Sequence, residues 1–290
     1  MSLTERSRRK SAPSRRAAPA ATASAEILRC NPERKAVRRT DKVAREEPLE
    51  IRVRGVSVAV TMRTPGHDAE LAAGFLLTEG LIRERRDVTM IAECPAAAVP
   101  ENTINVFLAP GVNLDLARLT RHVFASSSCG LCGKASIDSV HQHFPPLDSD
   151  LVVDLRMIAA LPEKMRRAQR AFDQTGGLHA AAIFDARGRL IVLREDVGRH
   201  NAVDKVIGHG FLEAKLPFAS HVLLVSSRAS FEILQKALAA GIPMVCAVSA
   251  PSSLAVEFAR ESGQTLVGFL RDGGMNVYAG AERIRVKSNS

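Results

Sequence analysis

The stretch His221-Val222-Leu223-Leu224-Val225 decides the fold, together with two later apolar runs like it at 243–248 and 265–270. Each run has the length of a strand, and helical spacing fills the gaps at 230–240 and 252–261. Short buried strands separated by helices imply right-handed crossovers and a parallel sheet. The sequence therefore predicts an α/β fold built on these three strands.

Upstream segments add antiparallel strands and a helical layer. Residues 180–184 and 190–193 flank the turn Asp185-Ala186-Arg187-Gly188, which indicates a hairpin and makes the sheet mixed. Residues 155–172 have the spacing of a helix that is interrupted, or that starts afresh, at Pro162. A last strand is expected at 275–278.

The N-terminal half predicts a smaller α+β region. Residues 51–60 alternate, with a change of phase at Gly55, which indicates two strands joined there. A helix is expected from Asp68, capped by that residue and stopped at Gly80. His67, Asp68 and Glu70 also resemble metal ligands, but a capped helix start is the favoured interpretation. Later elements are expected in this region, namely a strand at 104–108 and a partly helical segment at 114–124.

Composition divides the chain into three parts. Residues 1–45 carry 13 basic and 4 acidic side chains, which is the whole net charge of +9, and are expected to be a disordered basic tail. Residues 46–145 form the N-terminal α+β region, and 146–290 form the α/β domain. Because the charge after residue 45 is balanced and aromatic residues make up only 4%, we expect no nucleic-acid binding.

Cysteine usage and hydropathy indicate the cellular compartment in which the protein works. The five cysteines do not form the dense framework of a secreted disulfide protein. No stretch reads as a membrane span, and the N-terminal segment lacks the apolar core of a signal peptide. We therefore expect a cytoplasmic protein that is not bound to a membrane.

Cys129-Gly130-Leu131-Cys132-Gly133 is the most reactive stretch. The glycines favour a loop, and helical spacing follows it, so a helix dipole and Lys134 would lower the pKa of the thiols. Three interpretations follow: the pair carries sulfur, it binds a metal, or it is two ordinary cysteines that happen to be close. We favour sulfur chemistry, because the other cysteines are single and scattered; zinc ligation with His141 or His143 is the alternative.

Polar residues follow each of the three predicted parallel strands, at Ser226-Ser227-Arg228, at 249–253 and at 271–274. Carboxyl ends of parallel strands share one edge of a sheet, which is where ligands bind. Serines and glycines beside helix starts suit phosphate oxygens, although each group alone would be a cap or a turn. We expect a phosphate-bearing ligand at this edge.

Four stretches together resemble the FdhD family of formate dehydrogenase accessory proteins. They are the Cys129–Gly133 loop, residues 175–181 (TGGLHAA), residues 195–205 (EDVGRHNAVDK) and residues 269–274 (FLRDGG). The resemblance runs from about Leu49 to Arg285. It implies a cytidine-deaminase-like mixed sheet with flanking helices, a smaller N-terminal region and, as a family property, a homodimer.

The resemblance also implies a function and a set of residues. A member of this family is a sulfurtransferase that carries persulfide sulfur from a cysteine desulfurase to the molybdenum bis-guanine-dinucleotide cofactor, which formate dehydrogenase requires. The persulfide cysteine corresponds to Cys129, with Cys132 as its partner. The residues implied to bind the cofactor are Phe269, Leu270, Arg271, Asp272, Gly273 and Gly274.

Several alternatives stay open beside this function. The chain could be a molybdenum-cofactor chaperone or adaptor that transfers no sulfur, or a zinc-binding CxxC module. Deamination is not expected, because His179-Ala180-Ala181 lacks the glutamate of H-x-E and 249–253 has no cysteine. Arg199, His200 and Lys205 either line the cofactor cavity or form a buried salt-bridge network.

Overall fold

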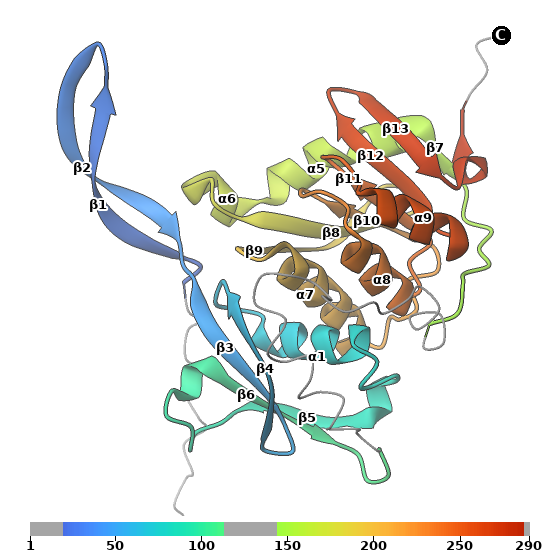
Figure 1. Cartoon of the computed structure of the whole chain (residues 1–290), viewed down its shortest axis with the longest axis horizontal. Helices are drawn as coiled ribbons and strands as arrows, with labels where there is room; N and C mark the ends of the chain where they lie inside the picture. The colour runs from blue at the N-terminus through green and yellow to red at the C-terminus, as the bar shows by residue number, and fades with distance from the viewer. Residues whose placement is uncertain (1–19, 113–143, 287–290) are drawn as a thin grey trace, which may run out of the picture.

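A computed structural model describes residues 20–112 and 144–286. Its centre is a six-stranded mixed sheet in the order β13-β12-β11-β10-β8-β9, in which β10, β11 and β12 are parallel and the remaining neighbours are antiparallel (Figure 1). The strands are β8 (His179–Asp185), β9 (Leu190–Asp196), β10 (His221–Val225), β11 (Met244–Ala247), β12 (Thr265–Arg271) and β13 (Gly274–Ala279). The predicted mixed α/β sheet is confirmed.

Helices cover both faces of this sheet (Figure 1). On one face lie α4 (Leu155–Ala159), α5 (Leu161–Ala168) and α6 (Arg170–Thr175); on the other lie α7 (Arg199–Leu212), α8 (Phe231–Ala239) and α9 (Ser253–Glu261). Along β10, Val222 and Leu224 pack toward the first set of helices, whereas Leu223 and Val225 pack toward the second. Burial on both faces explains why this strand is apolar throughout instead of alternating.

The N-terminal region is a four-stranded sheet in the order β4-β3-β6-β5 beside helix α1 (Asp68–Thr78). Its strands are β3 (Glu47–Val53), β4 (Val56–Arg63), β5 (Val88–Glu93) and β6 (Thr103–Leu108). The predicted hairpin is confirmed, with positive φ angles at Arg54 (52°) and Gly55 (83°) and a register shift between Ile51 and Arg52. From residue 47 onward, the other described elements are three short 3-10 turns (85–87, 100–102, 281–283) and the two-residue strands β7 (Val153–Asp154) and β14 (Ile284–Arg285).

Helix α1 begins at the expected residue, but Asp68 does not cap it. The N-cap is His67, which has a φ of 60° and makes no capping hydrogen bond through its side chain. The Asp68 carboxylate instead accepts two hydrogen bonds from the buried Arg63 guanidinium, each of 3.0 Å. The strong bidentate pair outcompetes the weaker cap. Gly80, at a φ of 73°, lies just past the end of the helix as predicted.

Helices α1 and α7 cross so closely that only glycine fits at the contact. A Cβ on Gly74 would lie 1.9 Å from the carbonyl oxygen of Asp204, and one on Gly208 would lie 1.8 Å from that of Glu70. The same contact is supported by a buried polar cluster, in which Lys236 Nζ lies 2.9 Å from an Asp204 oxygen and 2.9 Å from Thr78 Oγ1. The crossing joins the N-terminal region to the larger sheet through one continuous apolar core.

An ion pair also joins the two parts. Arg194 of β9 donates to both carboxylate oxygens of Glu70 in α1, at 2.5 and 2.6 Å, and His67 lies 3.3 Å from the same carboxylate. Burial opposes ionisation of Glu70, but Arg194 and His67 outweigh it and lower the pKa of Glu70 from 4.5 to about 2.

Stability should therefore fall in acid. Because the folded pKa of Glu70 lies below the unfolded value, its ionised form stabilises the fold above pH 4.5, and that contribution is lost as the pH falls toward 2. After a discount for solvent screening, we expect about 1–2 kcal/mol. Urea unfolding at pH 7 and pH 3 measures it: Glu70→Gln should be less stable than the parent chain at pH 7 and should lose less on acidification. An equal pH response in both would contradict this assignment, and exposed Glu213→Gln is the control.

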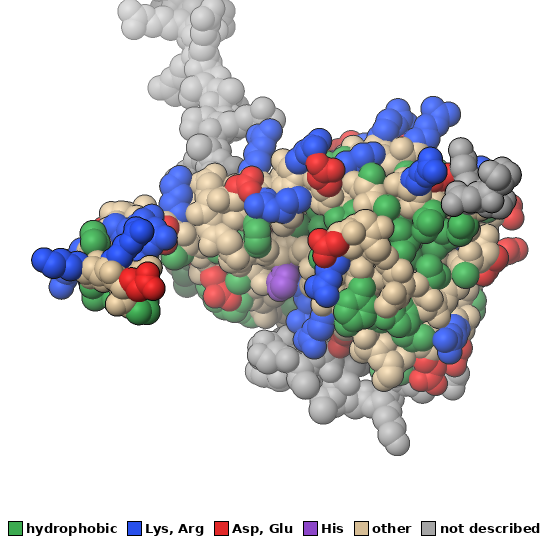
Figure 2. All heavy atoms as spheres, turned by 90° about the horizontal axis from the view of Figure 1, so that it is seen from above, with side chains coloured by type: hydrophobic (Ala, Val, Ile, Leu, Met, Phe, Trp, Pro, Cys, Tyr) green, Lys and Arg blue, Asp and Glu red, His purple; other side chains and the backbone are tan. Residues whose placement is uncertain are grey.

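The expectation of a disordered N-terminal tail is wrong for residues 22–44. They form an antiparallel hairpin of β1 (Thr22–Asn31) and β2 (Arg34–Ala44), which stands apart from the body in Figure 1. Backbone pairing holds it, with a turn in which Asn31 Oδ1 accepts from the amide of Glu33 at 2.8 Å. Figure 2 shows Lys and Arg side chains gathered on this arm. An argument from composition considers only what a segment can bury, so it misses an exposed hairpin.

The helical segment expected at 155–172 consists of three short helices, and α5 starts afresh beside Pro162, as one of the two predicted alternatives has it. Pro162 lies in the first turn of α5, where its missing N–H costs nothing, and Gly176 ends α6 at a φ of 65°. The predicted 114–124 segment lies outside the described residues. Within the described ranges, no helix is long and apolar enough to cross a membrane.

Candidate functional site

The three predicted polar groups do share one edge of the large sheet. Strands β10, β11 and β12 run parallel, so their carboxyl ends meet. The loops that follow are bonded to each other: Ala229 donates to the Ala250 carbonyl at 3.2 Å, and Phe269 donates to the Ser249 carbonyl at 3.1 Å. This edge is the ligand-binding edge of open α/β sheets.

The turn predicted to bind the cofactor, 269–274, connects β12 to β13 at that edge. Leu270 is buried in the core, whereas Arg271, Asp272, Gly273 and Gly274 are exposed. Positive φ angles at Phe269 (50°), Asp272 (53°) and Gly273 (76°) bend the backbone, and no atom lies within 4 Å of where a Cβ on Gly273 would be. The turn thus presents open backbone next to the Arg271 guanidinium, which lies 5.6 Å from the Phe269 ring.

The serines at this edge differ in what they do. Ser252 is a helix cap, because its hydroxyl accepts from the amide of Ala255 at 3.2 Å at the start of α9. Ser226 Oγ accepts from the amide of Ala180 at 2.9 Å, which leaves its hydroxyl hydrogen free to donate elsewhere. The cap interpretation is therefore right for Ser252, and Ser226 keeps a donor for a ligand.

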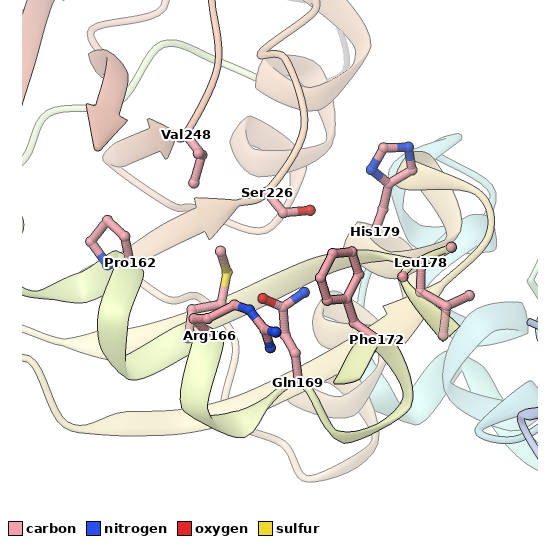
Figure 3. A pocket seen from close by; sticks show the side chains of 11 residues that line it. Pro162, Arg166, Gln169, Phe172, Leu178, His179, Ser226 and Val248 are labelled. Atoms are coloured by element: carbon pink, nitrogen blue, oxygen red, sulfur yellow. The ribbon is translucent and has the colours of Figure 1, made fainter. Parts of the chain in front are cut away.

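A cavity of about 660 Å³ opens beside this edge, between helices α5 and α6 and the ends of β10 and β11 (Figure 3). Its polar lining consists of Arg166, Gln169, His179 and Ser226; its apolar lining includes Pro162, Met165, Phe172, Leu178 and Val248. Burial, followed by the nearby charge of Arg199, lowers the pKa of His179, so its imidazole is neutral at pH 7. The turn 269–274 lies at the same edge but does not line this cavity.

The polar cluster at 195–205 serves mainly as structure. Lys205 Nζ lies 2.6 Å from Asp196 Oδ2 and donates to the Thr64 carbonyl at 2.8 Å, and all three residues are buried. The other Asp196 oxygen accepts from the amide of Gly198 and from Asn201 Nδ2, at 2.8 and 3.0 Å. Of the two alternatives left open for Lys205, the buried salt bridge is the one observed, and Lys205 does not line the cavity between α5 and α6 and the sheet.

Arg199 and His200, at the start of α7, differ from Lys205 in that each has a buried nitrogen without a hydrogen-bond partner in the described part of the chain. Arg199 Nε and His200 Nε2 are buried and make no hydrogen bond to any described residue. Burial, with the charges of Lys236 and Arg199, lowers the pKa of His200 to about 4, so this histidine is neutral at pH 7. Its Nε2 lies 3.9 Å from the Glu232 carboxylate, beyond hydrogen-bond distance. Because these two nitrogens have no partner among the described residues, both side chains are still able to bind a ligand.

The sequence-predicted catalytic residues Cys129 and Cys132 lie outside the described residues. Of the cysteines in the described ranges, Cys30 is exposed, Cys94 is half-buried and Cys246 is buried. Burial raises the pKa of the Cys246 thiol, which makes it unreactive. Those ranges hold no group of three or more side chains arranged to bind a metal, and the acids beside His67 are engaged with arginines.

Sequence reasoning missed the helical wall of the cavity. Met165 and Phe172 fit the helical spacing predicted at 155–172, so from the sequence they are ordinary core residues of one helix. Gln169 carried no signal at all, because a lone glutamine in a helical pattern is normally exposed. The glycine pair before Leu178 and His179 was the one local sign that the chain turns there toward a cavity.

The fold and this edge define a mixed α/β protein whose polar loops gather at the carboxyl ends of its parallel strands. The FdhD/NarQ family model matches residues 44–285, and the chain belongs to that family. A relative from Streptomyces coelicolor, named sulfur carrier protein FdhD, is 54% identical over 86% of this chain and 91% of its own length. The protein of that name from Mycobacterium tuberculosis is 52% identical over 86% and 93%.

A solved structure agrees with this fold. A crystal structure described as a formate dehydrogenase accessory protein from Desulfotalea psychrophila matches with a TM-score of 0.73 and 26% sequence identity. The match covers 91% of this chain and 99% of that one. The family match starts at residue 44, so the β1–β2 hairpin lies almost entirely outside it.

Proposed function

We propose that this protein is a sulfurtransferase in the maturation of formate dehydrogenase. It accepts persulfide sulfur from a cysteine desulfurase on Cys129 and passes that sulfur to the molybdenum bis-guanine-dinucleotide cofactor, which is its substrate. The observation that carries the proposal is the Cys129-Gly130-Leu131-Cys132 pair in a chain of the FdhD/NarQ family. Its relatives at about half identity are named sulfur carrier proteins.

The chemistry of loading is thiol–disulfide exchange. The Cys129 thiolate attacks the outer sulfur of the donor's persulfide, the donor's S–S bond breaks, and the donor leaves as a thiolate. The product is a persulfide on Cys129 that keeps the transferred sulfur and its proton. The reaction needs reduced thiols, so its proposed setting is the reducing cytoplasm.

Two routes lead from the loaded cysteine to the acceptor. In one, the Cys132 thiolate attacks Cys129 sulfur, expels hydrosulfide and leaves a disulfide that a dithiol reductant must reopen. In the other, Cys132 takes the outer sulfur and carries it onward. Both routes use the pair, and a glycine-flanked loop suits either.

The acceptor is proposed to bind at the turn 269–274. The Arg271 guanidinium is exposed and suited to phosphate, and the open backbone at Gly273 lets an oxyanion approach the amides. The shared edge with Ser226 and Ser249 supports a ligand that carries phosphates. Formate dehydrogenase is the proposed recipient of the finished cofactor, and a homodimer is the proposed assembly.

A mass measurement tests the sulfur step directly. The reduced protein is incubated with a cysteine desulfurase and cysteine, and then its intact mass and its peptides are measured. We expect one added sulfur on the Cys129 peptide, absent from Cys129→Ala and retained in Cys30→Ala. A protein that gains no sulfur but holds stoichiometric zinc would refute the proposal in favour of a zinc-binding module.

A further inference from the structure

The β1–β2 hairpin, residues 22–44, projects from the body as a two-stranded arm (Figure 1). Strand β1 has 10 residues, and at about 3.3 Å per residue the arm is roughly 30 Å long. The arm meets the body at its base, where Lys42 Nζ lies 3.0 Å from Gln174 Oε1 of α6. A two-stranded ribbon is marginally stable in water unless it packs against something. Beyond its base, the arm therefore offers a surface to another molecule.

The register of the arm divides its side chains between two faces. Opposite residues in an antiparallel pair project to the same side, so Lys42 and Ala44 share one face with the residues opposite them. That face meets the body, because Lys42 bonds to Gln174 and a Cβ on Gly177 would lie 3.5 Å from that of Ala44. The other face, which we call the outward face, carries the pairs Ala23–Val43, Ala25–Asp41, Ile27–Arg39 and Arg29–Val37.

The outward face combines apolar and cationic side chains. Val37 is 57% exposed and Val43 is 41% exposed, and Ile27, which lies between them along the arm, is half-buried. Arg29 and Arg39 are exposed, and their guanidinium groups pair with no residue that the structure describes. Arginine beside apolar side chains is typical of protein interfaces. This face is therefore complementary to an acidic surface that also carries apolar side chains.

Charge favours a protein partner over nucleic acid and over a second copy of this chain. The arm holds six basic and three acidic side chains, so its net charge is +3, whereas residues 46–290 are balanced and offer it no net opposite charge. Nucleic acid is disfavoured because Asp41 lies on the outward face and residues 22–44 contain no aromatic side chain to stack on a base. An acidic protein surface fits best.

The base of the arm adjoins the wall of the cavity. Helix α6, which the arm contacts through Gln174, also contributes Phe172 to the cavity lining, and Gly177, beside Ala44, lines the cavity too. A protein held on the arm is therefore near the edge of the large sheet where the acceptor cofactor is proposed to bind. That position suits the protein that takes the cofactor away.

We propose that the outward face of the arm docks an acidic surface of formate dehydrogenase that does not yet hold its cofactor. Arg29 and Arg39 pair with carboxylates of that surface, and Ile27, Val37 and Val43 pack on its apolar side chains. The docking surface stands on geometry and charge. The identity of the partner rests on the proposed function, in which formate dehydrogenase receives the finished cofactor.

Binding of the full chain to cofactor-free formate dehydrogenase of the same organism tests the proposal by biolayer interferometry. We expect Arg29→Glu with Arg39→Glu to weaken binding about tenfold or more at about 50 mM salt, and the parent chain to lose affinity at about 300 mM. Arg29→Gln with Arg39→Gln should weaken binding in the same direction if the charge reversal disrupts the hairpin. Arg156→Glu with Arg187→Glu, two exposed arginines of the body, makes the same change in net charge and should bind like the parent chain.

The outcomes separate this proposal from its rivals and from the proposed function. Parent-like binding by the Arg29 and Arg39 variants, or no binding by the parent chain, would overturn it. A dimer that depends on the arm, tighter arm-dependent binding of a DNA duplex, or loss of sulfur loading on Cys129 in these variants would also overturn it, by assigning the arm to a second copy, to nucleic acid or to the sulfur donor. A parent chain that loads no sulfur but still binds through the arm would refute the proposed function and leave the docking surface in place.

Discussion

Gly208→Ala is expected to lower the free energy of unfolding by roughly 3–5 kcal/mol. A Cβ at this position would lie 1.8 Å from the Glu70 carbonyl oxygen and 2.8 Å from the Gly74 amide nitrogen. Both atoms belong to the backbone of α1, so no side chain can rotate away, and the helices must separate. Separation would also lengthen the 2.9 Å hydrogen bond from Thr78 Oγ1 of α1 to Asp204 Oδ1, because Asp204 lies one turn earlier on α7.

Urea unfolding measures this effect as a lower midpoint with an unchanged slope. Gly177→Ala is the matched control, because its Cβ would lie 3.5 Å from the nearest atom, the Ala44 Cβ, which is an ordinary contact. We expect the control to change stability by no more than about 0.5 kcal/mol. A Gly208→Ala protein as stable as the parent chain would show that α1 and α7 do not touch at this residue.

The close crossing illustrates what periodicity cannot predict. The strands at 221–225, 243–248 and 265–270 were predictable because each is an apolar run with turn residues on both sides, and that information is local. Gly74 and Gly208 are far apart in the sequence, and each alone reads as a weak point in a helix. They are required only because α1 and α7 come into contact at these two residues, and the spacing of residues in the sequence does not reveal that contact.

The candidate site was predictable to a similar degree. The edge that carries Ser226, Ser249 and Arg271 follows from the parallel strands, because strand ends must converge. The partner of Lys205 did not follow, because a lysine in a polar cluster is equally consistent with a cavity or a salt bridge, and only the 2.6 Å contact with Asp196 decides. The burial of Gln169 in the cavity wall did not follow either, because it depends on how helices α5 and α6 pack on the sheet.

The sequence analysis did not predict the β1–β2 hairpin or strand β5, and the two omissions have different physical reasons. The hairpin has almost no buried surface, so a rule based on burial predicts disorder, although complementary backbone donors and acceptors suffice to pair the two segments. Strand β5 is six residues of mixed polarity, and its pairing with β6 makes it a strand more than its own pattern does. In β5, the hydrogen bonds to β6 outweigh the weak strand propensity of its own residues.

Cys129→Ala is expected to reduce formate dehydrogenase activation on the order of a hundredfold or more, because the variant lacks the thiolate that is proposed to accept sulfur from the donor. The same variant should keep the thermal stability of the parent chain and its affinity for the cofactor. Loss of activation with binding retained is the pattern of a sulfurtransferase. A non-catalytic chaperone of the cofactor predicts that Cys129→Ala still supports activity.

The measurement is formate oxidation by formate dehydrogenase produced in cells that hold each variant as the sole copy. Cys30→Ala, an exposed cysteine in the β1–β2 hairpin, is the matched control and should activate normally. Peptide mapping of the parent chain during turnover then distinguishes the routes. A Cys129–Cys132 disulfide that forms with each transfer assigns release to Cys132, whereas added sulfur found on the Cys132 peptide assigns it a carrying role.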